Sequence, residues 1–261
     1  MAFVHLHNHS EYSILDGMNK ITDLVSRARA LQMDAVALTD HGFMYGAIPF
    51  YRACFPENEK ENSGKELLRP IKPIIGCEIY TTPYSRFKKE GKEDAINYHL
   101  ILLAKSWKGY QNLCKLVSKA RIEGFYYKPR ADFELLEEYH EDIIALSACI
   151  KGQVPYLINE DRTDEALKIA KHFKDIFGSD YYFEIQNHFL PEEKKVMPIL
   201  RDMGKQLGIS LVATQDAHYP ERKDAFAHDI LLCVQTLADH DDPNRLRFSS
   251  DDYYLKSEEE M

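Results

Sequence analysis

Short apolar runs rich in β-branched and aromatic residues recur along the chain, and most are followed by a longer segment with helical periodicity. Such alternation is typical of α/β folds in which helices join parallel strands. The pattern predicts about seven strands, at residues 2–6, 35–39, 74–80, 99–104, 143–147, 181–185 and 211–214.

Three segments between the predicted strands carry apolar residues at the spacing of one helix face. They are Ile21, Leu24, Val25 and Ala28 after Asn19 as a cap; Leu167, Ala170, Phe173 and Phe177 ending at Gly178; and Val196, Leu200, Met203 and Leu207 between Pro191 and Gly208. A proline in the first turn and a glycine just past the last turn are typical of helix ends. We therefore expect three amphipathic helices here.

Parallel strands with helical returns form either an open doubly wound sheet or a closed barrel. An open sheet of the dinucleotide-binding kind would place a glycine-rich loop after its first strand, whereas here His-x-His-x-His follows. Residues that can bind metals also stand near the ends of most predicted strands, as on the catalytic face of a barrel. We predict one domain over residues 1–261, a barrel of about seven βα units, with the charged residues 57–69 as an exposed loop.

The charge balance limits the classes of partner. The chain of 261 residues has 33 Lys and Arg against 42 Asp and Glu, a net charge of −9. An acidic domain has no overall field that attracts nucleic acid or an anionic membrane, so a nucleic-acid role needs a local site. Five scattered cysteines without a C-x-x-C pair argue against a disulfide framework and a zinc ribbon. With no basic leader and no long apolar run, we expect a soluble cytoplasmic protein.

Three histidines, His5, His7 and His9, alternate along one extended segment, so their side chains project to one face. Neutral imidazoles are ligands for zinc, manganese or iron. A single histidine is more often a hydrogen-bonded core or surface residue, but three within five positions favour a metal site.

More residues with metal-binding chemistry follow downstream. They are Asp16, His41, Glu78, His99, Cys149, Asp216 and His218. One catalytic zinc takes three protein ligands, so this larger set indicates two or three ions. A carboxylate such as Glu78 can bridge two ions about 3.5–4 Å apart, an arrangement suited to phosphate-ester hydrolysis. Each residue also has a structural alternative: Asp16 as a turn residue, Asp40 as a helix cap, and Cys149 as a small buried apolar side chain.

Six stretches resemble the polymerase-and-histidinol-phosphatase (PHP) family, and most closely the N-terminal PHP domain of bacterial DNA polymerase III alpha subunits. The stretches are residues 5–17, 37–51, 72–80, 99–132, 145–155 and 213–219. The most specific is GYQNLCKLVSKARIEGFYYKPRAD, at residues 109–132, which other PHP phosphatases are not expected to share. The resemblance covers nearly the whole chain.

The resemblance implies a distorted seven-stranded (βα)7 barrel with a trinuclear metal centre at the C-terminal ends of its strands. Matched motif by motif, the first ion would be held by His7, His9, Glu78 and Asp216, the second by Glu78, His99 and Cys149, and the third by Asp16, His41 and His218. We expect His5 and Asp40 to support these ligands from behind. Zinc suits the Cys and His content, and manganese or iron suits the carboxylates.

Family members with an intact ligand set are associated with a metal-dependent 3′–5′ exonuclease. All nine positions are filled here, so the resemblance implies an exonuclease acting on DNA 3′ ends, single-stranded ones above all, with Asp216, His218 and Glu78 as catalytic residues. Two alternatives stay open: a non-catalytic module that supports the rest of a replicative polymerase, and a small-molecule phosphatase of the histidinol-phosphate type. We find no candidate palm carboxylates and expect no polymerase activity in this chain.

A DNA exonuclease must also hold the strand. The best candidates mix basic and aromatic side chains, which suits phosphate contact and base stacking. They are Lys115, Lys119, Arg121, Lys128 and Arg130, interleaved with Phe125, Tyr126 and Tyr127. The alternative is a solvated helix followed by a loop with packed aromatic rings.

Overall fold

The computed structural model describes residues 3–14, 16–55 and 69–261, which fall into two compact units. Unit 1 comprises the described residues of Met1–Asp40, Tyr45–Ile75 and Gln215–Met261. Unit 2 comprises His41–Met44 and Gly76–Thr214. The loop expected at residues 57–69 lies outside the described residues except for Arg69, which binds Asp34 at 2.6 Å.

Unit 1 is built from a few helices and a parallel strand pair. Its elements are α1 (Ile21–Ala30), β1 (Ala35–Leu38), α2 (Ala47–Cys54), η3 (Arg222–Asp224), α8 (Ala225–Thr236) and the first part of β2 (Lys72–Thr81). β1 pairs in parallel with Lys72–Ile75. The predicted stripe on α1 is confirmed, because Ile21, Leu24, Val25 and Ala28 are buried and share one apolar core with Phe50.

The expected cap of α1 is wrong. The N-cap residue is Lys20, and the side-chain amide of Asn19 donates instead to the backbone carbonyls of His9 and Ala217, at 2.8 and 3.3 Å. Asn19 therefore fixes the segment that carries the histidines.

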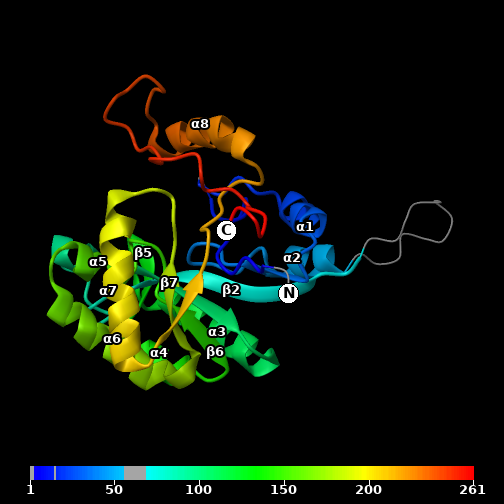
Figure 1. Cartoon of the computed structure of the whole chain (residues 1–261). Coiled ribbons are helices and arrows are strands. Elements are labelled where there is room, and N and C mark those ends of the chain that lie inside the picture. The colour runs from blue at the N-terminus through cyan, green and yellow to red at the C-terminus, as the bar shows by residue number, and fades with distance from the viewer. Residues whose placement is uncertain (1–2, 15, 56–68) are drawn as a thin grey trace, which may run out of the picture. The chain divides into compact units, whose positions relative to one another are not determined.

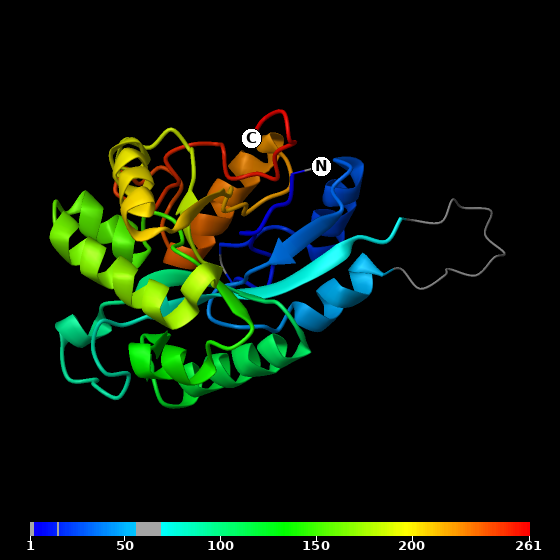
Figure 2. The same ribbon diagram turned by 60° about the horizontal axis from the view of Figure 1, so that its bottom comes forward.

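Unit 2 contains most of the sheet and five α-helices among its described residues (Figures 1 and 2). Its strands are the second part of β2, β3 (Tyr98–Ala104), β4 (Phe125–Tyr126), β5 (Lys128–Ala131), β6 (Ile143–Leu146), β7 (Tyr181–Ile185) and β8 (Ser210–Ala213). Its helices are η1 (Lys92–Ala95), α3 (Trp107–Ile122), α4 (Phe133–Tyr139), α5 (Gln153–Asn159), α6 (Thr163–Phe177), η2 (Gly178–Asp180) and α7 (Pro191–Leu207).

The ends of α6 and α7 are confirmed. Gly178 follows α6 with a φ of 58°, and Gly208 follows α7 in the left-handed region with a φ of 64°. Glycine adopts a positive φ without the clash that a Cβ atom would cause, so it ends these helices cleanly.

The α/β class is confirmed, but the uniformly parallel barrel is not what the strands form. The sheet is mixed, with the order β4-β5-β2-β3-β6-β7-β8 and with β1 beside β2. β3 runs antiparallel to both β2 and β6, and within the described residues no ladder joins β4 to β8. A buried apolar strand has the same composition in either direction, so the sequence pattern could not reveal this reversal.

Six of the seven predicted strands are present, and the first is not. Residues 3–6 form no strand, while residues 1–2 lie outside the described part. The short antiparallel pair of β4 and β5 was not predicted. Among the described residues, no helix has the length and apolar character needed to cross a membrane.

Candidate metal centre

In unit 1, a single parallel bridge places two pairs of predicted ligands on one face. Asn8 pairs with Ala217, the His9 amide donates to the Ala217 carbonyl at 2.9 Å, and the Ala217 amide donates to the His7 carbonyl at 3.2 Å. Because side chains alternate along an extended chain, the neighbours of the bridged residues project to the same face. His7 and His9 thereby meet Asp216 and His218.

Three of these side chains form a regular triangle. Nε2 of His7, Nε2 of His9 and Oδ1 of Asp216 each lie 3.1 Å from the other two. Ligands bonded to one ion at about 2.0–2.1 Å stand about 2.9–3.4 Å apart in octahedral or tetrahedral geometry. The donor atoms and their spacing therefore fit a zinc- or manganese-sized ion.

Asp40 and Ser13 orient the imidazole of His9. Oδ1 of Asp40 accepts from the Ser13 hydroxyl at 2.8 Å, and Nδ1 of His9 lies 3.0 Å from that hydroxyl. Since the hydroxyl proton goes to Asp40, Nδ1 of His9 donates to Ser13, and Nε2 keeps its lone pair for a metal. Asp40 also accepts from the amide of Ser10 at 2.6 Å, so it is not a helix cap but holds the turn after His9. Ser13 had not been predicted, although it lies four residues after His9.

The carboxyl of Asp216 stays ionised. Burial alone would raise its pKa, but His7, His218 and His9 hold the pKa of Asp216 well below its usual range. Asp216 also has a φ of 51°, which is unusual for a residue with a side chain. A carboxylate beside imidazole rings is a typical metal ligand set.

His218 lies beside this triangle, and His228 links it to the turn of Asp16. The ring of His218 stacks on His9 with centroids 4.5 Å apart, and its Nδ1 donates to the Asp216 carbonyl at 2.8 Å. That bond leaves Nε2 of His218 as the acceptor atom. The Asp16 carbonyl accepts from Nε2 of His228 at 2.8 Å. His228 had not been predicted, because no local pattern marks a contact between positions so far apart.

In unit 2, Glu78 lies between two histidines. Its Oε2 is 2.8 Å from Nδ1 of His41, and its Oε1 contacts Nδ1 of His99. Glu78 sits within β2, while His99 is the second residue of β3 rather than at a strand's carboxyl end. Because β3 is antiparallel to β2, its start lies beside the end of β2, which places His99 near Glu78.

The local backbone explains the Asp-His-Gly motif around His41. The Gly42 amide donates to the Glu78 carbonyl at 2.8 Å, which seats His41 against β2. Gly42 has a φ of 67°, and a Cβ atom there would lie 3.0–3.1 Å from Pro129 and Tyr80. Only glycine fits this position without strain.

Burial lowers the pKa of His99, against the opposing effect of Glu78. A neutral His99 can donate a lone pair to a metal, and with Glu78 and His41 it forms a buried group able to hold an ion. The ring of Tyr80 borders this group, with its centroid 5.3 Å from His99 and 6.1 Å from His41.

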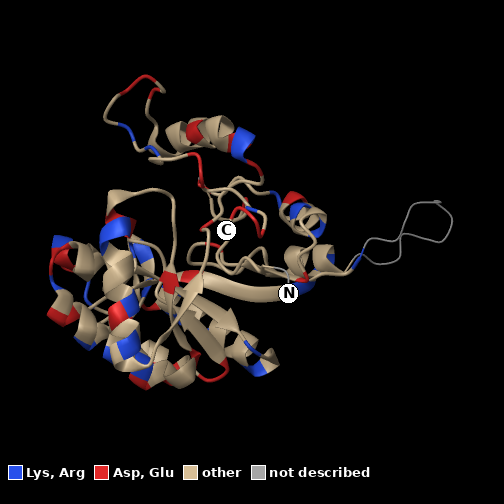
Figure 3. Cartoon of the chain, in the orientation of Figure 1, with Lys and Arg blue, Asp and Glu red and all other residues tan. Residues whose placement is uncertain are grey.

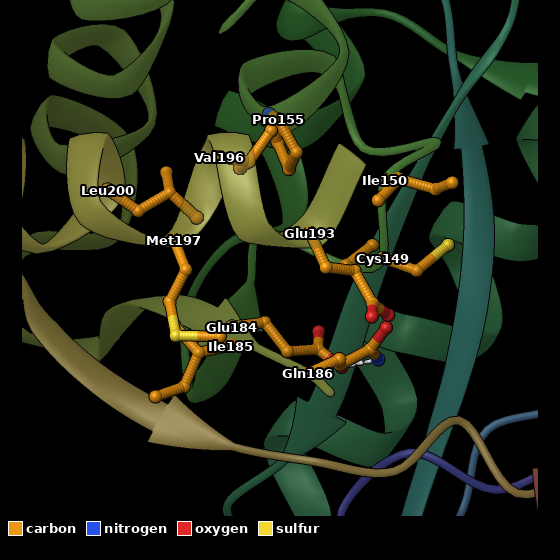
Figure 4. Close-up of a pocket in the computed structure, with 11 residues that line it drawn as sticks. Cys149, Ile150, Pro155, Glu184, Ile185, Gln186, Glu193, Val196, Met197 and Leu200 are labelled. Atoms are coloured by element: carbon orange, nitrogen blue, oxygen red, sulfur yellow. Dashed lines mark hydrogen bonds between the residues drawn. The ribbon is translucent and has the colours of Figure 1, made fainter. Parts of the chain in front are cut away.

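Cys149 follows β6 in a loop that is tied to His99. The His99 amide donates to the Lys151 carbonyl at 3.0 Å, and His99 bridges Gly152. Cys149 is half-buried, forms no disulfide, and lines a cavity of about 20 Å³ together with Gln186 and Glu193 (Figure 4). The placement of the loop beside His99 agrees with a ligand role, which stays a prediction.

His5 supports the backbone of unit 1. Its Nε2 donates to the Lys256 carbonyl at 2.9 Å, and its own carbonyl accepts from the Ala37 amide at 2.9 Å. Burial lowers the pKa of His5 to about 4, so the ring is neutral near pH 7.

The predicted DNA contact of Arg130 is wrong. The side chain of Arg130 is fully buried, and its guanidinium donates to the carbonyls of Gly124, Asp94, Arg86 and Lys88. A guanidinium buried and bonded in this way stabilises the fold and is out of reach of a phosphate at the surface.

The other basic candidates lie at the surface. Arg121 stands 4.0 Å from the ring centroid of Phe125, Lys128 lies 5.0 Å above Tyr80, and Lys119 binds the carboxylate of Glu138 at 3.0 Å. Along the helices of unit 2, Lys and Arg alternate with Asp and Glu (Figure 3). The described helices of unit 2 thus present a surface of mixed charge (Figure 3).

The profile of the PHP domain family matches residues 5–188. This range includes seven of the nine predicted ligands: His7, His9, Asp16, His41, Glu78, His99 and Cys149.

The chain belongs to the PHP domain family. Among its PHP relatives are the DNA polymerase III alpha subunits of Treponema pallidum (strain Nichols), 50% identical over 265 residues, and of Borreliella burgdorferi, 45% identical over 260 residues. These matches cover 100% and 99% of this chain, and the chain spans 22% of the length of each relative. This PHP domain thus corresponds to the N-terminal region of those subunits.

Among solved structures, PsfC from Pseudomonas syringae PB-5123 matches with a TM-score of 0.47 and 13% sequence identity. The match covers 82% of this chain and 75% of that one. A similarity this weak has no bearing on function.

Proposed function

We propose that this PHP domain is a metal-dependent phosphoesterase, and specifically a 3′–5′ exonuclease that removes nucleotides from DNA, with single-stranded 3′ ends as its preferred substrate. The observation that carries the proposal is the triangle of His7, His9 and Asp216, whose three donor atoms lie 3.1 Å apart. The chain also belongs to the PHP family, which includes phosphoesterases, and this supports a phosphate ester as the substrate.

We further propose the trinuclear assignment that the family motifs imply. The first ion would be held by His7, His9, Glu78 and Asp216, the second by Glu78, His99 and Cys149, and the third by Asp16, His41 and His218. Zinc or manganese, or iron in their place, suits this donor set. Bound ions supply Lewis acidity toward phosphate oxygens and water.

Three of the chain's own residues would then have distinct roles at this site. Asp216 stays ionised and keeps His7 and His9 in place. His218 donates a hydrogen bond from its Nδ1 to the Asp216 carbonyl, so its Nε2 is the ring nitrogen that would bind the third ion. Glu78 fixes His41 and His99 at once through its two carboxylate oxygens.

The strand would be held by Lys128 and Arg121, with Lys119 in a lesser role because it is paired with Glu138. Lys128 is the best placed, since it lies above Tyr80, whose ring borders His41 and His99. A lysine at this position can contact the phosphate next to the one that is cleaved.

The relatives' greater length supports one biological setting, in which residues 1–261 form one PHP domain of a longer replicative polymerase subunit in the cytoplasm. In that setting the rest of the polymerase is the domain's partner. The non-catalytic alternative predicts that the same metals are bound but that no nucleotide is released.

Product analysis tests the proposed reaction. The chain is incubated with a DNA strand that ends in a 3′-hydroxyl and, separately, with p-nitrophenyl phosphate, a phosphate monoester. An exonuclease releases nucleoside monophosphates from the strand, whereas a phosphatase releases inorganic phosphate from the monoester. Glu78→Gln should abolish nucleotide release, and Glu141→Gln, at an exposed glutamate whose carboxylate lies 3.3 Å from Lys108, should retain it. Release of phosphate alone would contradict the proposal.

A further inference from the structure

Phe189 is a large aromatic residue held in an unfavourable position. Its side chain is 61% exposed, and its backbone has a φ of 66°, the left-handed region that bulky residues rarely adopt. It lies in the loop between β7 and α7. Exposure of the ring gains nothing from the hydrophobic effect, so neither packing nor backbone preference explains this residue.

A buried carboxylate holds the loop on both sides of Phe189. Oε2 of Glu193 accepts from the amides of His188 and Leu190 at 2.7 and 3.2 Å, and Oε1 lies 2.5 Å from Nδ1 of His188. His188 is 1% and Glu193 5% exposed. The flanking residues are therefore fixed, and the ring of Phe189 is presented to solvent from a rigid loop.

The loop lies at the edge of the sheet where the candidate ligands of unit 2 gather. β6 and β7 are parallel neighbours, so their carboxyl ends share one edge, the usual place for ligand sites in α/β sheets. Cys149 follows β6 there, next to Ala148 with a φ of 63°. The loops after the two strands line one cavity through Cys149, Gln186 and Glu193 (Figure 4).

We propose that Phe189 is a stacking platform for the base of the nucleotide at the 3′ end of the DNA strand. A flat, exposed and rigidly held ring suits an unpaired base, because every base offers a π-face. The loops after β6 and β7 each hold a residue with positive φ, Ala148 and Phe189, and such backbone strain is found at binding sites. The inference rests on the proposed function for its substrate, but it concerns binding and not cleavage.

Fluorescence anisotropy of a 5′-labelled single strand tests this directly. All variants are made in the Asp216→Asn background, so that the strand is not consumed. Two strands are compared, one with an ordinary 3′-terminal nucleotide and one whose 3′-terminal nucleotide lacks its base. With Phe189 present, the ordinary strand should bind about 5- to 100-fold more tightly than the abasic one.

Phe189→Ala should remove this difference by weakening only the ordinary strand, and Phe189→Trp should keep it. Phe226→Ala, which removes another exposed phenylalanine, on α8, should change neither affinity. Matching thermal unfolding curves show that the variants are folded. An unchanged preference in Phe189→Ala, or equal binding of both strands by the parent protein, would overturn the inference. The two proposals can fail separately. If the chain cleaves no DNA but still prefers the ordinary strand through Phe189, the inference stands and the proposed exonuclease activity fails.

Discussion

Nε2 of His228 lies 2.8 Å from the backbone carbonyl oxygen of Asp16, 212 positions earlier in the chain. The carbonyl can only accept, so the ring donates. The same ring meets His218 edge-on, with centroids 5.7 Å apart. His228 therefore ties the turn of Asp16 to His218, and these are two of the three proposed ligands of one ion.

Replacing His228 with phenylalanine keeps a ring beside Phe248 and Tyr219 but removes the bond to Asp16. We expect the affinity for the weakest-bound ion to fall by about tenfold, because supports behind metal ligands have effects of this size. Competition with a chromogenic chelator measures the metal affinity of each variant. His240→Phe, at a half-exposed histidine of unit 1, is the control. Unaltered affinity in His228→Phe would mean that the tie to Asp16 does not serve the metal.

Local patterns were enough to predict much of the site in unit 1. The alternation of His7 and His9 and the Asp216-x-His218 pair place four side chains on one face because an extended chain alternates its side chains. Motif resemblance pointed to Glu78, His41 and His99, which the structure gathers in unit 2.

Contacts between distant segments, the burial of single charged side chains and strand direction could not be predicted from the sequence. The hydrogen bond from His228 to Asp16 joins two distant segments, and no periodic pattern in the sequence marks it. Arg130 was taken for a DNA contact because a cation beside aromatic residues has the same composition whether it is exposed or buried. The reversed direction of β3 was missed for a similar reason, since apolar runs carry no sign of strand direction.

Cys149 provides a test of the second ligand set that does not depend on activity. Metal binding should slow alkylation of Cys149 by iodoacetamide by about tenfold or more, because a thiolate bound to zinc is a poorer nucleophile. Cys114, also half-buried but on α3, should react at the same rate with and without metal. Burial raises the pKa of Cys54 to about 12, so this thiol should stay unlabelled in both cases. Mass spectrometry of digested samples gives each rate, and equal rates for Cys149 would remove it from the ligand set.

Substitution of Arg130 should lower the stability of the fold, whereas substitution of Arg121 should leave it almost unchanged. Arg130→Met leaves four backbone carbonyls, three of them in buried hydrogen bonds, without their donor, and we expect the free energy of unfolding to fall by about 3 kcal/mol or more. Arg121→Met should change it by less than about 0.5 kcal/mol, because the side chain is exposed. Urea unfolding followed by circular dichroism measures both. Equal stability of the two variants would contradict the structural role of Arg130.

The central claim is that the residues around the His7, His9 and Asp216 triangle bind metal ions, and that the domain uses these ions to hydrolyse DNA from its 3′ end. The most direct measurement is the time course of cleavage of a 5′-labelled single strand by protein stripped of metal and then loaded with zinc or manganese. Asp216→Asn and Asp241→Asn, the latter at a fully exposed aspartate, are prepared in the same way.

We expect a ladder that shortens from the 3′ end with the metal-loaded parent chain and with Asp241→Asn, and a rate more than about a hundredfold lower with Asp216→Asn. The metal-free chain should leave the strand intact. Cleavage by Asp216→Asn at the parental rate, or an uncut strand in the presence of a chain shown to contain its metals, would contradict the account.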